Sequence, residues 1–324
     1  MRAPLVALAL FLAVAPAPSA AASVSDYTIL VDGETAHGLL AVPAGAPLGL
    51  VVVSHGYGHK AESHRGHLQH LADEGYVAVA MDFRGEGMPL RAGADDTLAA
   101  THALIAQYAP DLVVLYSVSM GTAVASMVLA ESGGVDCSAV DKSQHRCDGV
   151  FDYWVDNEGL VMLHETWAGA SALAPTGNPT AVGAVADIEA ECGGSPIVAP
   201  DCYLERSAVI RAPEFVGLKG AIQTHGLNDG LVPYDQGREM RAALAAIGVP
   251  TEFYTVATCP QGSEGTTLTG HAGQGGRGVC GHGTESNDAH TLTELSFRLL
   301  DELLGGAVPH DAEHIVDGTL GTLP

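Results

Sequence analysis

Short runs of apolar, β-branched residues recur along this chain and alternate with segments of helical spacing. Such runs are typical of strands buried on both faces, because none of their positions needs to face water. The runs occupy residues 48–54, 76–83, 112–118, 149–155, 218–225 and 251–257, and the predicted helices between and after them occupy residues 63–74, 120–131, 235–247 and 287–304. This alternation predicts an α/β fold, with a mainly parallel sheet and helices on both of its faces.

Other local signals complete the predicted order of elements. Residues 27–42 alternate as one or two strands, with Asp32-Gly33 as a turn. Asp96 or Thr97 is a suitable N-cap for a helix that runs towards Tyr108. Asn178-Pro179 predicts the start of a further helix inside a region that breaks the regular alternation.

These signals divide the chain into five predicted parts. We interpret the irregular region as a cap inserted over the C-terminal edge of the sheet. The parts are a signal peptide at residues 1–21, the first part of the core at 22–156, the cap at 157–215, the second part of the core at 216–305 and a C-terminal tail at 306–324.

The N-terminal residues have the composition of a secretory signal. Arg2 is followed by an apolar run at residues 5–15, which is too short to span a bilayer. Small residues follow, and a cleavage site near Ala21 fits the small-x-small rule. The expected location of the mature protein is therefore secreted or periplasmic.

Six cysteines all lie after the predicted signal peptide. An even number in an exported protein favours disulfides. Proximity in sequence favours three short loops: Cys137–Cys147, Cys192–Cys202 and Cys259–Cys280. No pair has the C-x-x-C spacing of a zinc site, so we predict no structural metal.

The chain is strongly acidic, with 38 Asp and Glu against 14 Lys and Arg and a formal net charge of −24. Such a surface repels nucleic acid and anionic membranes, and both are excluded as main partners.

The segment with sequence LVVLYSVSMG, residues 112–121, carries the main catalytic signal. A predicted buried strand ends at Ser119 and a helix follows at once, as in the G-x-S-x-G nucleophile elbow. The tight turn requires small residues two positions before and after the serine. Gly121 meets this requirement, and Ser117 stands in place of the first glycine. Ser119 is therefore the predicted nucleophile, and the Met120 N–H lies at a helix N-terminus where it can stabilise an oxyanion.

From this motif onward the chain resembles the α/β-hydrolase superfamily. The sequence VVVSHGYG at residues 51–58 is similar to the strand and His-Gly turn that supply the second oxyanion donor in that family. The resemblance assigns this donor to the Tyr57 N–H and makes His55 a structural residue. It implies an α/β-hydrolase fold in which a serine transfers an acyl group to water without a cofactor.

A second motif supplies the acid. The sequence HGLNDGLVP at residues 225–233 resembles the H-G-x-x-D-x-x-V-P segment of dienelactone hydrolases and enzymes like prolyl oligopeptidase. That resemblance makes Asp229 the residue that orients the catalytic histidine. Asp152 or Asp156, near the end of the preceding predicted strand, is a rival position for the acid.

In the chain order Ser, Asp, His, the base follows Asp229. Five histidines do so: His271, His282, His290, His310 and His314. We favour His282, because the predicted Cys259–Cys280 bridge would anchor it near the last strand, and we keep His271 as the alternative base.

The predicted activity is hydrolysis of a small-molecule or polymeric carboxylic ester. The arrangement of Tyr57 and Met120 around the elbow is also similar to cutinase-like and polyester-degrading enzymes. A serine peptidase of the prolyl-oligopeptidase-like type and a non-catalytic binding protein of the same fold are the alternatives.

Overall fold

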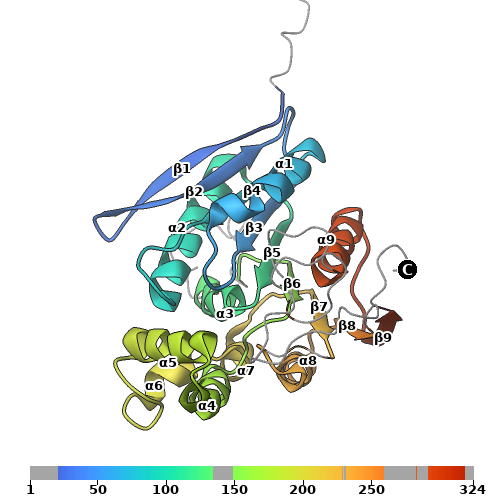
Figure 1. Cartoon of the computed structure of the whole chain (residues 1–324). Helices are drawn as coiled ribbons and strands as arrows, with labels where there is room; N and C mark the ends of the chain where they lie inside the picture. The colour runs from blue at the N-terminus through green and yellow to red at the C-terminus, as the bar shows by residue number, and fades with distance from the viewer. Residues whose placement is uncertain are drawn as a thin grey trace, which may run out of the picture.

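The computed structural model describes residues 21–133, 149–227, 229, 231–258, 282 and 291–317. These residues contain a sheet of nine strands in the order β1-β2-β4-β3-β5-β6-β7-β8-β9 (Figure 1). The hairpin of β1 and β2 is antiparallel, β2 is antiparallel to β4, and the pairs from β4 to β9 are parallel. The strands are β1 (Ser23–Val31), β2 (Glu34–Val42), β3 (Leu50–Ser54), β4 (Val77–Met81), β5 (Val113–Val118), β6 (Tyr153–Asn157), β7 (Gly220–Gly226), β8 (Thr251–Thr258) and β9 (Ala312–Asp317).

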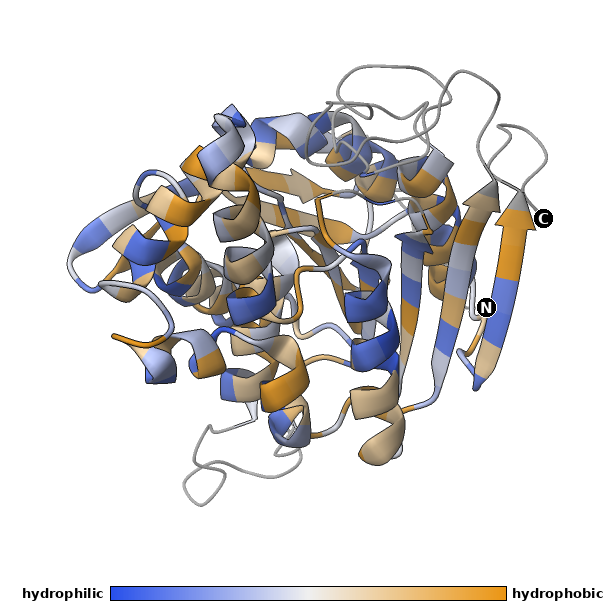
Figure 2. Ribbon diagram, turned by 60° about the horizontal axis from the view of Figure 1, so that its bottom comes forward, coloured by the Kyte–Doolittle hydropathy of each residue, from blue (hydrophilic) through white to orange (hydrophobic). Residues whose placement is uncertain are grey.

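Helices cover both faces of this sheet. Successive side chains of a strand point to opposite faces, so Val51 and Val53 of β3 join one apolar core and Leu50 and Val52 join the other. The first core packs under α1 (Arg65–Asp73), which follows a 3-10 turn η1 (Ala61–His64), and α9 (Thr291–Leu304). The second packs under α2 (Leu90–Tyr108), α3 (Gly121–Ser132) and α8 (Tyr234–Ala246). Apolar segments therefore concentrate in the strands between the helices (Figure 2).

A group of helices follows β6 and precedes β7 in the sequence, and it lies at one end of the sheet (Figure 1). Its members are α4 (Leu163–Leu173), η2 (Ala174–Thr176), α5 (Pro179–Cys192), α6 (Pro200–Glu205), α7 (Ala208–Arg211) and η3 (Ala212–Glu214). The Asn178 side chain accepts a hydrogen bond from the Ala181 N–H and caps α5, as the sequence predicts. We call residues 163–214 the helical cap.

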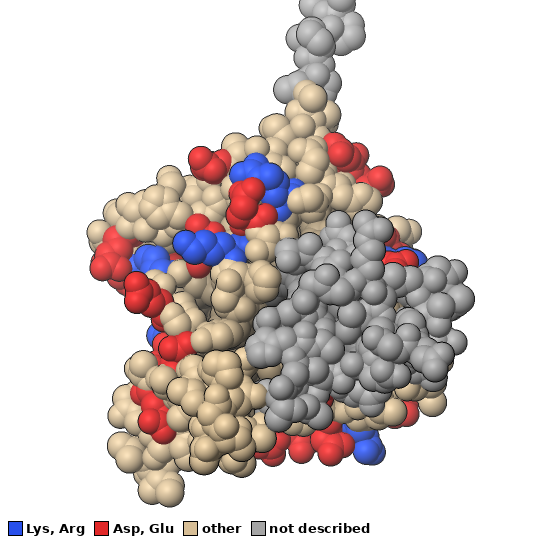
Figure 3. Space-filling view, viewed as in Figure 1, with Lys and Arg blue, Asp and Glu red and all other residues tan. Residues whose placement is uncertain are grey.

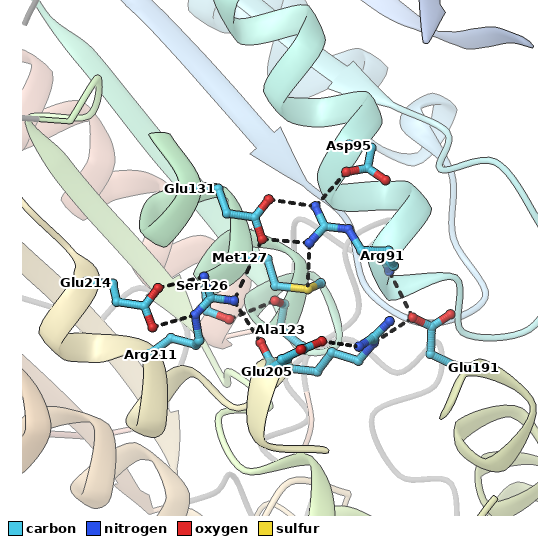
Figure 4. A network of polar contacts seen from close by, with 11 residues as sticks. Arg91, Asp95, Ala123, Ser126, Met127, Glu131, Glu191, Glu205, Arg211 and Glu214 are labelled. Carbon is cyan, nitrogen blue, oxygen red and sulfur yellow. Dashed lines mark hydrogen bonds and ion pairs between the residues drawn. The ribbon is translucent and has the colours of Figure 1, made fainter. Parts of the chain in front are cut away.

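Ion pairs connect the helical cap to the core (Figure 4). Arg91 of α2 bonds to Glu131 of α3 at 2.6 Å, and the Arg91 N–H donates to Glu191 of α5 at 3.0 Å. Glu191 also accepts from Arg206 at 2.7 Å, and Arg211 lies 3.7 Å from Glu131. Cap helices and core helices thus share charged groups.

Over the face seen in Figure 3, Asp and Glu outnumber Lys and Arg.

Two predicted elements have different bounds in the structure, and the expectation for the α2 start is corrected. This helix begins at Leu90, not after Asp96 or Thr97. The Asp96 carboxylate is buried and accepts hydrogen bonds from the backbone and side chain of Arg84, so it holds the loop after β4 instead of capping a helix. The strand expected at 149–155 spans Tyr153–Asn157, because the Asp152 carboxylate accepts from the Val113 N–H at the strand start.

The structure also adds an element that the sequence did not predict. The predicted tail forms β9, which pairs in parallel with β8 at the edge of the sheet. Among the described residues, no helix has the length and apolar character needed to cross a membrane.

Candidate active site

Ser119 occupies a sharp turn between β5 and α3. Its φ angle is +53°, in the left-handed region that non-glycine residues rarely adopt. The turn is held on both sides, since the Ser119 N–H donates to the Asn157 carbonyl at 2.9 Å and the Ser119 carbonyl accepts from Thr122 at 3.0 Å. A Cβ atom on Gly121 would lie 2.3 Å from the Ser54 carbonyl oxygen, so the helix can start here only with glycine. The sequence motif thus forms the expected strained elbow.

Ser117, which replaces the first glycine of the usual motif, has polar contacts of its own. Its buried hydroxyl accepts a hydrogen bond from the Trp154 indole at 2.9 Å and lies 3.1 Å from the Thr122 hydroxyl. The serine therefore satisfies a buried indole that a glycine would leave without this partner.

His282 contacts both the serine and the acid. Its Nε2 lies 2.8 Å from the Ser119 Oγ, and its Nδ1 lies 2.8 Å from the Asp229 Oδ2. The carboxylate can only accept, so we assign the ring proton to Nδ1, which leaves Nε2 to accept the serine proton. The other carboxylate oxygen, Oδ1, accepts from the N–H groups of Leu231 and Val232. The three side chains form one continuous line of hydrogen bonds.

Two neighbouring histidines stabilise the ionised form of Asp229. Its side chain is fully buried, and burial alone would raise its pKa. The neighbouring His282 and His225 outweigh burial and hold the pKa of Asp229 well below its usual range. His225 lies 3.4 Å from Asp229. Burial would lower the pKa of His225, but its hydrogen bond to Asp229 raises it. Asp229 therefore remains a carboxylate that can accept a hydrogen bond from the His282 Nδ1.

A second carboxylate, which sequence reasoning missed, lies beside the same histidine. Glu158 follows β6, is fully buried, and places its Oε2 4.0 Å from the His282 Nδ1. Its position just after a predicted buried strand, at the edge where Ser119 and Asp229 also lie, is the signal that could have found it. Glu158, Asp229 and His282 lie close enough together to hold a metal ion. We assign the Nδ1 atom instead to its hydrogen bond with Asp229, because the distance is that of a hydrogen bond.

The rival acids lie elsewhere. The Asp156 carboxylate accepts from the Thr122 hydroxyl at 2.5 Å, and burial raises the pKa of Asp156. Asp152 pairs with Lys219 at 2.9 Å. Neither is bonded to His282, so the structure places Asp229 and not these residues beside this histidine.

A cleft of about 500 Å³ lies beside one of the two candidate oxyanion donors, between the loop at residues 55–60 and the loop at 82–89. Met120 lines this cleft and precedes the first residue of α3. Tyr57 lies in the turn after β3, and its hydroxyl donates to Asp187 of α5. Burial, and then this hydrogen bond, raises the pKa of Tyr57 to about 12. The His55 ring stacks on Phe83 with centroids 4.0 Å apart, as a structural residue would.

The remaining predicted residues divide into two groups. The Cys192–Cys202 disulfide is confirmed, with Cα atoms 5.5 Å apart, and it joins the end of α5 to α6. The alternative base His271 and the cysteines of the other two predicted bridges lie outside the described residues; these are Cys137, Cys147, Cys259 and Cys280.

Solved structures of α/β-hydrolases share this architecture. Pyrococcus horikoshii acylaminoacyl peptidase has a TM-score of 0.58 and 14% identity over 90% of this chain and 43% of its own. This chain thus spans less than half of that peptidase. An esterase of Pyrococcus furiosus has a TM-score of 0.58 and 18% identity over 87% of this chain and 91% of its own. Brefeldin A esterase, a bacterial homologue of human hormone-sensitive lipase, has values of 0.55 and 22% over 78% and 71%.

No protein-family model matches the sequence, and no curated protein matches it. The identification therefore comes from structure: the strand order, the elbow and these neighbours show that the chain has the α/β-hydrolase fold.

Proposed function

We propose that this protein is a secreted serine hydrolase that cleaves carboxylic esters, with Ser119, His282 and Asp229 as its catalytic residues. The observation that carries the proposal is the line of two 2.8 Å hydrogen bonds that joins a serine on a strained elbow to an imidazole and a buried carboxylate. A nucleophile, a base and a group that orients the base are the parts that acyl transfer requires.

In the proposed reaction the Ser119 Oγ attacks the ester carbonyl carbon while the His282 Nε2 takes the hydroxyl proton. Asp229 holds the Nδ1 proton and stabilises the imidazolium that forms. The tetrahedral intermediate collapses, the carbon–oxygen bond to the alcohol breaks, and the imidazolium protonates the departing alcohol. A water molecule then attacks the acyl-enzyme with His282 again as base, and the acid leaves while Ser119 regains its proton.

The negative charge of each intermediate would be stabilised by the N–H groups of Met120 and Tyr57. The Met120 group lies next to the N-terminus of α3, where the helix dipole favours an anion. The hydrogen bond from the Tyr57 hydroxyl to Asp187 links the turn that carries the second donor to the helical cap. Preorganised donors of this kind contribute a factor of about 100 to 1,000 each to kcat.

The first test uses Ser119→Ala, with Ser132→Ala as a matched control. Ser132 lies at the other end of α3 and its hydroxyl donates to the Leu129 carbonyl, far from the elbow along the helix. We expect Ser119→Ala to lose at least about a thousandfold in turnover of p-nitrophenyl butyrate and all labelling by a fluorophosphonate probe, whereas Ser132→Ala retains both. Unchanged turnover in a folded Ser119→Ala protein would exclude the proposed nucleophile.

A substrate panel tests the choice of ester over peptide. A serine peptidase uses the same triad chemistry, and the fold is shared by esterases and by acylaminoacyl peptidase. We expect p-nitrophenyl esters of short acids to be cleaved faster than aminoacyl p-nitroanilides relative to the uncatalysed rate of each. The opposite order would assign the protein to the peptidases.

Secretion is supported by the composition of residues 1–21 and by the Cys192–Cys202 disulfide, because disulfides persist in oxidising compartments. Expression of the full chain in a bacterium with a secretory pathway, followed by N-terminal sequencing, should find exported protein that starts close to Ala22. Retention of uncleaved protein in the cytosol would contradict this part of the proposal.

A further inference from the structure

Glu158 is held in an unfavourable backbone conformation at the end of β6. Its φ angle is +52°, which a non-glycine residue adopts only when its surroundings impose it. The Glu158 N–H donates to the Thr224 carbonyl at 2.9 Å, and two residues later the Leu160 N–H donates to the Ser119 carbonyl at 3.0 Å. The residue is thus fixed between the strand that precedes the acid and the turn that carries the nucleophile.

The backbone just after Glu158 is closely packed. A Cβ atom on Gly159 would lie 2.4 Å from the Asp156 carboxylate and 2.6 Å from Thr122, so the backbone passes close to α3. The Glu158 side chain has no exposed surface. A buried carboxylate is costly unless neighbouring groups stabilise its charge, and His282 is one group placed to do so.

Two acids from neighbouring strands reach the same nitrogen atom. The His282 Nδ1 is 2.8 Å from the Asp229 Oδ2 and 4.0 Å from the Glu158 Oε2. Oxygen atoms of both acids and a nitrogen of His282 all lie within 4.8 Å of one another. Since β6 lies between β5 and β7 in the sheet, the residues after these strands converge on one point.

Acidic side chains from two neighbouring strands face the His282 ring. Asp229 follows β7 and Glu158 follows β6, and both face the ring. One step further away, His225 contacts Asp229 and the charge of Asp156 acts on His225. Glu158 is therefore the nearest charge to the ring after Asp229 among the described residues.

We propose that Glu158 is a second acid for His282: a positioning residue that helps to stabilise the imidazolium and that replaces Asp229 in part when Asp229 is removed. The inference rests on the proposed function, because it needs His282 to gain and lose a proton during turnover. The proton on the His282 Nδ1 stays on the ring throughout the reaction, as it would if Asp229 were the only acid. At 4.0 Å the effect of Glu158 is electrostatic, and between side chains as deeply buried as these such an effect is only weakly screened.

A double-mutant cycle tests this inference. The four proteins are the wild type, Asp229→Ala, Glu158→Gln and the double variant, and the measurements are kcat and KM for p-nitrophenyl butyrate. Glu158→Gln in the wild-type background should lower kcat by about tenfold with KM unchanged, because the lost charge acts on the transition state. In the Asp229→Ala background the same substitution should cost at least about a hundredfold, because Glu158 is then the remaining acid.

The pH profile provides a readout that a purely structural role would not change. Glu158→Gln should move the acid limb of the kcat/KM profile to lower pH, because one negative charge that favours the protonated imidazole has gone. Glu158→Asp keeps the charge and should leave the limb near its original position. Asp152→Asn is the matched control: it alters a buried carboxylate at the start of the same strand that pairs with Lys219 and not with His282, and the limb should not move.

An equal loss from Glu158→Gln in both backgrounds, or an unmoved acid limb, would overturn the inference. If Glu158→Gln fails to fold, as thermal unfolding would show, Glu158→Ala and its double variant with Asp229→Ala, which also remove the carboxylate, replace it in the cycle. The proposed function is tested separately, since Ser119→Ala abolishes turnover whether or not Glu158 acts on His282.

Discussion

The contact between the elbow and β3 makes Gly121→Ala a sensitive test of the structure. The added Cβ atom would lie 2.3 Å from the Ser54 carbonyl oxygen and 2.6 Å from the His55 carbonyl oxygen. Both atoms belong to the backbone at the end of a buried strand, so neither can rotate away as a flexible side chain would. Ser54 also donates from its hydroxyl to the Gly121 carbonyl at 2.8 Å, which holds the two segments together.

The expected cost exceeds the usual benefit of replacing a helical glycine. Alanine in place of glycine in a helix stabilises a protein by about 0.5–1 kcal/mol. An overlap of nearly an ångström in a close-packed core costs about 1–3 kcal/mol or more. We therefore expect Gly121→Ala to lower the free energy of unfolding by roughly 2 kcal/mol, which is about 3 °C in Tm for a domain of this size. Any shift of α3 also displaces the Met120 N–H, so kcat should fall.

Urea and thermal unfolding followed by circular dichroism measure the loss, and turnover of p-nitrophenyl butyrate measures the effect on the elbow. Gly169→Ala in α4 is the matched control, because a Cβ atom there has nothing within 4 Å. It should be neutral or more stable by up to about 1 kcal/mol. If Gly121→Ala were as stable and active as Gly169→Ala, the packing of the elbow against β3 described above would be wrong.

Three further predictions concern the cap, the acid and the cleft. Replacing Cys192 and Cys202 by serine removes the disulfide that closes a loop with a sequence separation of 10 residues. The chain-entropy relation predicts that the free energy of unfolding falls by about 3 kcal/mol, which urea unfolding can measure. The pair of His225 and Asp229 should stabilise the fold most between about pH 4 and 6.5. The raised pKa of His225 gives stability that is lost as pH rises, and the lowered pKa of Asp229 gives stability that is lost as pH falls. The difference in unfolding free energy between wild type and His225→Gln should therefore be greatest in this range, and a difference that does not change with pH would contradict the prediction. The difference in alkaline absorbance between wild type and Tyr57→Phe reports the ionisation of the Tyr57 phenol, which we expect near pH 12. Ionisation near pH 10 would show that the hydrogen bond from Tyr57 to the cap is absent in solution.

Local sequence was sufficient to predict the elbow, and the resemblance of residues 225–233 to a family motif pointed to Asp229 as the acid. The turn at Ser119 is so tight that its residue types are constrained by neighbours only two positions away, which is why SVSMG can be recognised without any knowledge of the fold. The Asp229 side chain is also held locally, since its Oδ1 accepts from N–H groups two and three residues later in its own motif. Buried strands were also predictable, since both of their faces are apolar.

Boundaries that depend on distant partners were not predictable in this way. Asp96 has the residue type of a helix cap, but its carboxylate is used by Arg84, and α2 starts earlier. The predicted tail forms β9 because β8 offers a free edge to pair with, and no periodicity in the tail indicates this. A residue type suits several roles, and the partner that selects one role is brought near by the rest of the fold.

The sequence by itself determined that Ser119 is presented on a strand-to-helix turn and that Asp229 lies on a loop after a later strand, because both depend on local backbone geometry. Only the tertiary structure decided that His282 lies between these two residues and that Glu158 reaches the same ring. The reason is the lateral order of the sheet: β5, β6 and β7 are neighbours, so residues more than 100 positions apart end at one edge. An alternation of strands and helices along the chain does not specify which strands lie side by side, and that order brings Ser119, Glu158 and Asp229 to one edge.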